Sequence, residues 1–132
     1  MIFVDLNIPM YLVGASHPRK SDAQLLLEKM IRDRQRLVTD AEVLQEILHR
    51  YVSINRRDAI QPAFDLLLRV TDQVYSVDVE SASHAKEIVM GHPQVPARDA
   101  LHLAIMERHG IETIFTFDAG FDSFPGITRI FR

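Results

Sequence analysis

The chain has 132 residues, the length of one ordinary domain, and its 47% hydrophobic and 25% charged residues are a normal globular balance. These values argue against disorder and leave no room for a second domain, so we expect one domain over residues 1–132. Cysteine is absent, which excludes disulfides and thiolate metal sites. The formal net charge of −3 lacks the basic excess that usually marks a nucleic-acid binder. Any such contact would need local arginines, or cations bound in an acidic cleft.

The first residues are apolar, but Asp5, Asn7 and Pro9 interrupt them, and no basic segment precedes them. This pattern differs from that of a secretory signal or a membrane-spanning segment. The absence of cysteine also suits a reducing compartment. We therefore expect a cytoplasmic protein with no membrane partner.

Short apolar runs alternate along the chain with segments in which apolar residues recur at helical spacing. Strands that alternate with helices predict parallel pairing, with helices on both faces of the sheet. The expected fold class is α/β, a three-layer α/β/α sandwich around a central, mainly parallel sheet. In chain order we expect a strand at 2–4, a short helix ending near 14, a polar loop at 16–20, a helix at 22–34, a strand at 37–39, a helix to about 52, a helix at 57–70, a strand at 74–77, helices at 79–90 and 97–109, and strands at 113–117 and 128–131.

Single residues predict how some of these helices begin. Ser21 is expected to cap the helix that follows it. Thr39 and Glu42 have the spacing of a capping box. Pro62 lies inside another predicted helix, so it should occupy the first turn or mark a kink. One stripe of the helix after Thr39 is expected to face the core; its members are Leu44, Ile47, Leu48 and Tyr51.

Acidic residues stand where predicted strands end and where a helix begins. Asp5 and Asp118 each follow an apolar strand, and Asp99 opens a helix behind Pro96. Glu46 lies on the flank of a helical apolar stripe. Ligands bind beyond the carboxyl ends of the strands in open parallel sheets. If the strand ends converge, the repulsion among these carboxylates favours bound cations, and oxygen ligands favour Mg²⁺ or Mn²⁺ over zinc.

Each acid also has an ordinary structural interpretation. Asp5 and Asp99 could cap helices, and Glu42 fits a capping box better than a ligand role. Glu46 could be a solvated charge. The aspartates of the segment 118–122 could simply form a turn.

The basic residues give weaker signals. His102, between two leucines, is expected to be a buried helix histidine with satisfied partners, and the other five histidines show no ligand spacing. Arg56 and Arg57 are most typical of a solvated face. Arg98 stands beside Asp99 and could contact a phosphate.

Four segments, in this order, resemble the PIN-domain family, particularly the VapC toxins of bacterial toxin–antitoxin pairs. They span almost the whole chain, and the complete set is a strong signal. The segments are Phe3-Val4-Asp5-Leu6-Asn7, then Val38-Thr39 followed by Glu46, then Ala97-Arg98-Asp99-Ala100-Leu101-His102-Leu103-Ala104, and last Phe115-Thr116-Phe117-Asp118-Ala119-Gly120-Phe121-Asp122.

The resemblance implies a single PIN-like nuclease domain that acts as an Mg²⁺-dependent endoribonuclease, with Mn²⁺ as the alternative ion. Toxin members cut tRNA or rRNA, form homodimers and are blocked by a small cognate antitoxin, so these partners are expected here. The family's metal-binding and catalytic carboxylates map onto Asp5, Glu46, Asp99 and Asp118. The supporting candidates are Asn7, Thr116, Asp122 and Arg98. The chain departs from the family at two positions, because Leu6 and Asp40 stand where hydroxyl residues are common.

The expected mechanism is metal-assisted hydrolysis with one ion held mainly by Asp5 and Asp99 and a second ion left open. Glu46 and Asp118 would complete the coordination. The nearest enzymatic alternative is a phosphomonoester hydrolase with Asp5 as nucleophile, although the haloacid-dehalogenase pattern needs an acid where Asn7 stands. A non-catalytic acidic-cleft binding module is the alternative from another class.

Overall fold

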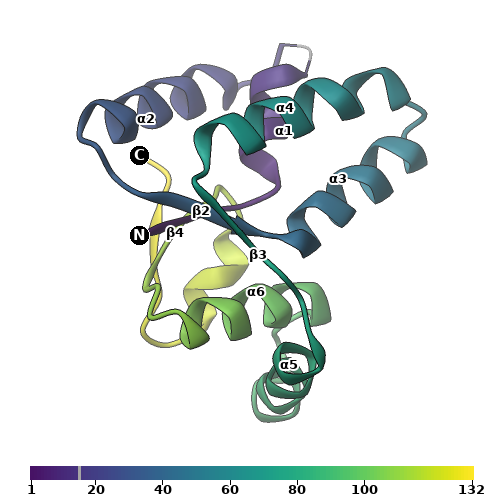
Figure 1. The fold of residues 1–132 in the computed structure, drawn as a ribbon, viewed down its shortest axis with the longest axis vertical. Coiled ribbons are helices and arrows are strands. Elements are labelled where there is room, and N and C mark those ends of the chain that lie inside the picture. Colours follow the sequence, from purple (N-terminus) through teal and green to yellow (C-terminus); the bar gives the residue numbers. More distant parts are fainter. Residues whose placement is uncertain (15) are drawn as a thin grey trace.

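A five-stranded parallel sheet runs through the middle of the molecule (Figure 1). The computed structural model describes residues 1–14 and 16–132. Its strands are β1 (Ile2–Val4), β2 (Leu37–Asp40), β3 (Gln73–Tyr75), β4 (Thr113–Phe115) and β5 (Thr128–Ile130). They lie in the order β3-β2-β1-β4-β5, and every neighbouring pair is parallel. The chain adds β2 and β3 on one side of β1, and then β4 and β5 on its other side. The carboxyl end of β1 therefore lies at a topological switch point.

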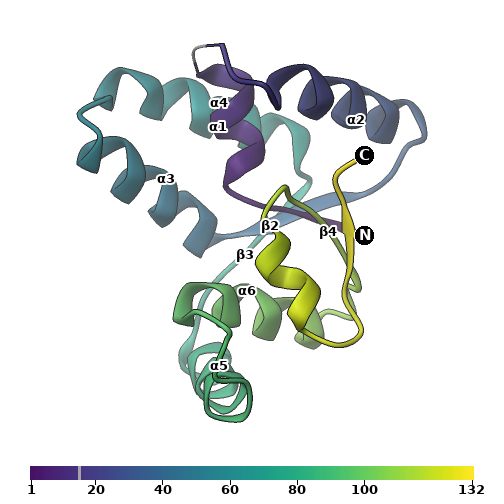
Figure 2. The same cartoon turned by 180° about the vertical axis from the view of Figure 1, so that it is seen from behind.

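Helices cover both faces of this sheet (Figures 1 and 2). One face carries α1 (Asn7–Val13), α2 (Lys20–Arg32) and α4 (Ile60–Val70), and the other carries α5 (Val79–Gly91) and α6 (Ala97–Arg108). This arrangement confirms the predicted three-layer α/β/α class. Two short 3-10 helices, η1 (Arg57–Ala59) and η2 (Ala119–Ser123), complete the described elements.

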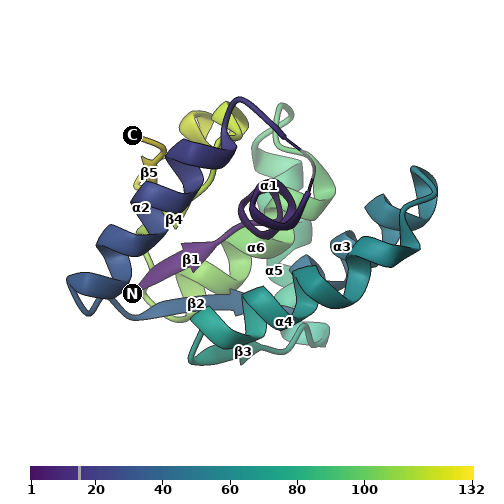
Figure 3. The ribbon, with the colours of Figure 1, turned by 90° about the horizontal axis from the view of Figure 1, so that it is seen from above.

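The third helix, α3 (Ala41–Ser53), starts directly at the carboxyl end of β2. It projects beyond the strands, next to α4 (Figure 3). Its first turns also contact α6. The helices α1, α3 and α6 surround the carboxyl end of β1. Two of them, α1 and α6, belong to the layers, and α3 lies beyond them.

The core lies on both sides of the central strands. All three residues of β1 are buried, as are all four residues of β2. Strands covered on both faces read as continuous apolar runs, which is why Ile2–Val4 could be recognised from sequence. Over residues 1–14 and 16–132, no helix combines the length and the apolarity needed to cross a bilayer.

Two predicted caps are wrong. The α2 helix begins at Lys20, so Ser21 lies inside it rather than at its N-cap. The N-cap of α3 is Asp40, whose Oδ1 accepts a hydrogen bond from the backbone N of Val43 at 2.9 Å. Thr39 still belongs to β2 and donates its hydroxyl to the Val4 carbonyl at 3.0 Å. The strand runs one residue further than expected, which moves the cap by one position and removes the capping box.

The buried side of α3 also differs from the predicted stripe. Ile47 and Tyr51 are buried as expected, but Leu48 is 42% exposed. Glu46, expected on a flank, is buried at 9% exposure. The main contacts of the projecting helix within residues 1–14 and 16–132 are with α4, η1, α6 and β2, and Leu48 lies on a side that these elements leave exposed. Pro62, in contrast, occupies the first turn of α4 as predicted, where its missing N–H is not needed.

Candidate active site

The carboxylate of Asp5 is fixed where β1 ends. The backbone N of Asp5 donates to the Phe115 carbonyl at 3.1 Å, which continues the pairing of β1 with β4. Oδ1 of Asp5 accepts from the backbone N of Leu6 at 2.8 Å, and Oδ2 accepts from the hydroxyl of Thr116 at 2.7 Å. The N-cap residue of α1 is Leu6, without a side-chain cap, so the capping interpretation of Asp5 is wrong.

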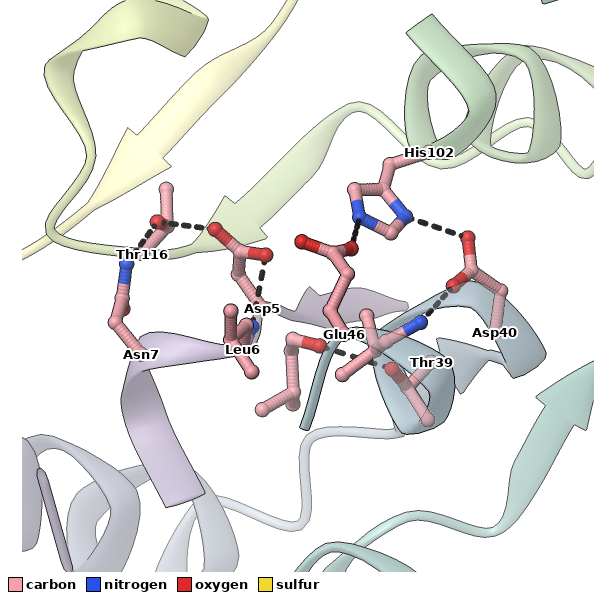
Figure 4. A network of polar contacts seen from close by, with 10 residues as sticks. Asp5, Leu6, Asn7, Thr39, Asp40, Glu46, His102 and Thr116 are labelled. Atoms are coloured by element: carbon pink, nitrogen blue, oxygen red, sulfur yellow. Dashed lines mark hydrogen bonds and ion pairs between the residues drawn. The ribbon is translucent and has the colours of Figure 1, made fainter. Parts of the chain in front are cut away.

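The hydroxyl of Thr116 is the junction of a polar network between β1 and the segment after β4 (Figure 4). It donates to Asp5 and accepts from Nδ2 of Asn7 and from the backbone N of Asp118, each at 3.0 Å. Oδ1 of Asn7 in turn accepts from the backbone N of Phe117 at 3.2 Å. These hydrogen bonds fix Asp5 and the start of the Asp118 turn relative to each other.

Asp99 approaches the same place from α6. It lies in the first turn and is buried, but the N-cap residue is Pro96, so Asp99 is not the cap. Burial, followed by the negative charges of Asp5 and Asp118, raises the pKa of Asp99 to about 6. Asp118 itself is exposed, and its Oδ1 accepts from the backbone N of Gly120 at 2.9 Å. Three aspartates from three separate elements thus act on one another electrostatically.

Glu46 reaches this region from α3 but is bonded to a histidine. His102 of α6 lies between two carboxylates: Nε2 is 2.5 Å from Oε1 of Glu46, and Nδ1 is 2.8 Å from Oδ2 of Asp40. Ionised carboxylates only accept hydrogen bonds, so both ring nitrogens donate and the ring is cationic. Burial opposes that charge, yet the charges and hydrogen bonds of Asp40 and Glu46 raise the pKa of His102 well above its usual value.

Two acids beside Asp99 also have a raised pKa. Burial, with a smaller contribution from the charge of Glu46, raises the pKa of Asp5, while His102 and Thr116 oppose this. Burial and the charge of Glu46 also raise the pKa of Glu42, which is half-buried at the edge of the same region. A cluster with this excess of negative charge attracts cations.

These side chains line a cleft of about 910 Å³ between α1, α3, α6 and the segment after β4. Aromatic rings form part of the wall: Tyr11 and Phe117 have ring centroids 5.6 Å apart. Basic side chains line it as well, and Arg98 stands next to Asp99. The cleft is therefore acidic at the carboxylates and edged by groups that suit an aromatic, anionic ligand.

Among the predicted residues, Asp122 lies elsewhere. It is exposed, and Arg129 donates to both of its carboxylate oxygens, at 2.9 and 3.0 Å. It does not line the cleft. The structure thus brings Asp5, Glu46, Asp99 and Asp118 to one cleft, with Asn7, Thr116 and Arg98 beside them.

The donor set fits a hard divalent cation in kind. All four acids offer oxygen, the ligand that Mg²⁺ and Mn²⁺ prefer. In the part of the chain described, no group of three or more His, Asp or Glu side chains is arranged to hold an ion as it stands. An ion would therefore need the acids to move closer together, and from Glu46 it could take only the oxygen that is not bonded to His102.

Two residues of this site were not assigned a role from sequence. His102 was expected to be buried and satisfied, and it is, but its partners Asp40 and Glu46 were not foreseen. One signal was available: His102 follows Asp99 by three residues, so both lie on the same side of α6. Asp40 also ends a strand, as Asp5 does.

Comparison with known proteins agrees with this geometry. A family model described as PIN domain matches residues 2–127. Ribonuclease VapC13 of Mycobacterium tuberculosis is 57% identical over 130 residues, which cover 98% of this chain and 99% of that protein. Ribonuclease VapC23 of the same species is 41% identical over 118 residues, covering 89% and 93%.

Two solved structures share the fold. One is M. tuberculosis VapC20, described as a sarcin–ricin loop cleaving toxin, with a TM-score of 0.77, 24% identity and coverage of 93% of this chain and 94% of that one. The other is VapBC2 from Rickettsia felis bound to a DNA fragment from its promoter, with a TM-score of 0.75, 17% identity and 98% coverage of both chains. The chain therefore belongs to the PIN-domain family, in its VapC branch.

Proposed function

We propose that this protein is an Mg²⁺- or Mn²⁺-dependent endoribonuclease, the toxin of a toxin–antitoxin pair, and that tRNA or rRNA is its substrate. The observation that carries this proposal is the meeting of Asp5, Asp99 and Asp118 in one cleft, where burial and their charges raise the pKa of Asp99 to about 6. The relatives named ribonucleases, which match nearly the whole chain, support the reaction class.

Asp5, Glu46, Asp99 and Asp118 would hold the ion. When bound, Mg²⁺ or Mn²⁺ supplies Lewis acidity, which activates water and offsets the negative charge of the phosphodiester. Thr116 orients Asp5 and favours its ionised form, because its hydroxyl donates to Oδ2. A bound cation would lower the raised pKa of Asp99, since a positive charge offsets the effect of its acidic neighbours.

The other cleft residues would position the RNA. Arg98 lines the cleft beside the carboxylates, where its guanidinium can pair with a phosphate oxygen. Tyr11 and Phe117 add aromatic surface to the wall. His17 stacks on Tyr11 and the Arg19 guanidinium lies over Phe117, so an unpaired base would have to displace one of them to stack there.

Asp5 is a poor nucleophile in this setting. It is 6% exposed, and each of its oxygens already accepts a hydrogen bond. The haloacid-dehalogenase pattern of a nucleophilic aspartate also needs an acid where Asn7 stands. A metal-assisted attack by water therefore fits the site better than a phosphatase with a phospho-aspartate.

The proposed partners are a small antitoxin and a second copy of the chain. Structural neighbours include complexes described as VapBC, FitAcB and a toxin–antitoxin complex from Klebsiella pneumoniae. An Arg or Lys of an antitoxin could occupy the carboxylate cluster in place of a metal ion. Co-purification with the neighbouring gene product and sedimentation of the free protein test these two partners separately.

Cleavage of end-labelled tRNA and rRNA, with Mg²⁺, Mn²⁺ or chelator, tests the activity. We expect cleavage only with metal, and its loss in Asp5→Asn and Asp99→Asn. Asp65→Asn is the matched control, because Asp65 is exposed on α4, accepts from Gln61 and does not line the cleft. Full cleavage by both cleft variants would contradict the proposal, and hydrolysis of a phosphomonoester in place of RNA would favour the phosphatase.

A further inference from the structure

His102 is buried at the back of the cleft and takes no part in the roles assigned above. Its ring lies between Asp40, at the end of β2, and Glu46, in the second turn of α3 (Figure 4). The side chains of His102 and Asp40 are fully buried, and that of Glu46 is 10% exposed. Water therefore competes little for these hydrogen bonds, and the three side chains form a continuous buried chain.

Asp40 and His102 each make a further contact that fixes the position of the side chain. Oδ1 of Asp40 accepts from the backbone N of Val43 at 2.9 Å, so only Oδ2 is left for His102. The ring of Phe3 packs against the imidazole, with centroids 5.3 Å apart. The imidazole is thus fixed by a carboxylate on one side and an aromatic ring on another, and its Nε2 can point only toward Glu46.

This anchoring leaves one oxygen of Glu46 for the cleft. Oε1 is bonded to His102, and Figure 4 shows the other oxygen directed toward Asp5. The charge of Glu46 acts on Asp5, which agrees with their closeness. A glutamate has three rotatable side-chain bonds, and ordering a side chain of this kind costs conformational entropy. A glutamate that is already ordered does not incur this cost when it takes up a ligand.

We propose that Asp40 and His102 are positioning residues, which hold Glu46 so that its second carboxylate oxygen faces Asp5 and is ready for a divalent cation. This inference rests on the proposed function, because it assigns Glu46 to the metal site. It also gives a role to Asp40, one of the two positions at which the chain departs from its family. Mutation of a hydrogen-bond partner that orients a metal ligand in this way commonly lowers metal affinity by about 10- to 100-fold.

Titration of the protein with Mn²⁺ alone tests the inference without RNA. Mn²⁺ binding is measured by calorimetry and by the electron paramagnetic resonance signal of free Mn²⁺. The variants are Asp40→Asn, His102→Gln and Glu46→Gln, with the two doubles that combine Glu46→Gln with each of the others. Asn is as good an N-cap as Asp, so Asp40→Asn keeps the cap of α3 and is the safer variant if His102→Gln fails to fold. Asp78→Asn is the matched control, because Asp78 caps α5 by the same bond, to Ser81 N at 2.8 Å, outside the cleft.

We expect Asp40→Asn and His102→Gln each to weaken Mn²⁺ binding by about 10- to 100-fold when Glu46 is present. In the Glu46→Gln background the same changes should have less than about a twofold effect, because positioning acts only through Glu46. Asp78→Asn should match wild type. A merely structural role for His102 would lower the melting temperature without this dependence on Glu46.

Two kinds of failure can be separated. If wild type binds Mn²⁺ and Asp40→Asn does not weaken it, or weakens it equally in both backgrounds, the positioning role is wrong and the proposed nuclease stands. If wild type binds no Mn²⁺, or if Asp99→Asn leaves binding unchanged, the metal site of the proposed function is wrong, and this inference falls with it.

Discussion

The hydroxyl of Thr116 donates to the carboxylate of Asp5 across 2.7 Å, although the two residues lie 111 positions apart in the chain. This bond links the ends of the neighbouring strands β1 and β4, and it is what turns two separate strand ends into one site. The same hydroxyl accepts from the backbone N of Asp118, so a second acidic residue is tied to the pair.

We predict that Thr116→Val destabilises the fold by about 1–3 kcal/mol, because buried polar groups around it lose their partner. RNA cleavage should fall by about 10- to 100-fold, since Asp5 loses the bond that orients it. Thr116→Ser keeps the hydroxyl and should retain both properties. Urea denaturation and single-turnover cleavage measure the two effects. A Val variant that cleaves RNA like wild type would show that this bond does not matter to the reaction.

The raised pKa of Asp99 predicts how stability depends on pH in chelator. Its folded pKa of about 6 lies above the unfolded value of about 4, so between these values the folded state binds more protons. Stability from this group therefore falls as pH rises through that window. Between pH 4 and 7, the free energy of unfolding should fall less for Asp99→Asn than for wild type, by about 1–2 kcal/mol. This difference is smaller than the full pKa shift would give, because water reaches the cleft and screens the charges. Urea denaturation across this range, without metal, gives the comparison, and parallel curves would mean that Asp99 does not face its acidic neighbours.

Asp122 is predicted to be dispensable for the reaction. Hydrogen bonds from Arg129 lower its pKa and occupy both of its oxygens. Asp122→Asn should therefore cleave RNA within about twofold of wild type, the range usual for an exposed residue outside a site. Steady-state cleavage rates with Mg²⁺ measure this. A large loss with unchanged melting temperature would place Asp122 in the metal site after all.

Arg98 is predicted to contact an RNA phosphate. Arg98→Gln should weaken RNA binding, and the slope of log affinity against log salt should become shallower by about 0.7, the value for one phosphate on a single strand. Filter binding at several salt concentrations, with Ca²⁺ in place of Mg²⁺, gives that slope. Arg69→Gln is the control, because Arg69 is exposed on α4 outside the cleft. An unchanged slope for Arg98→Gln would exclude the contact.

The position of Asp5 was predictable because strand ends in a parallel sheet follow from local pattern. The strand before Asp118 was predicted to run to residue 117, but β4 ends at Phe115, so Asp118 lies three residues beyond its end. The apolar run Ile2–Val4 predicts β1, and the residue after such a strand faces the ligand edge. Parallel pairing and the three layers follow from the alternation of strands with helices. For these features, local sequence and tertiary structure agree.

The cap of α3 could not be chosen locally. Thr39 and Asp40 both have side chains suited to an N-cap, and the outcome depends on how far β2 continues. Asp40 is still paired with Tyr75 of β3, and that pairing is set by residues far along the chain. The capping box therefore failed for a tertiary reason.

The contact between Glu46 and His102 is tertiary as well. The two residues are 56 positions apart, and they meet only because α3 and α6 are both placed around the end of β1. The flank position of Glu46 predicted a solvated charge, whereas α6 covers it with a histidine. Helical spacing indicates which side of a helix a residue occupies, but not which element covers that side.

The central claim is that Asp5, Asp99, Asp118 and Glu46 bind one divalent metal centre. The most direct test is anomalous scattering at the manganese edge from crystals soaked in Mn²⁺. We predict an anomalous peak in the cleft, with oxygens of Asp5 and Asp99 at about 2.0–2.2 Å, the range for a small divalent cation. The peak should disappear in Asp99→Asn. A crystal saturated with Mn²⁺ that shows no peak in this cleft, or the same peak in wild type and Asp99→Asn, would contradict the claim.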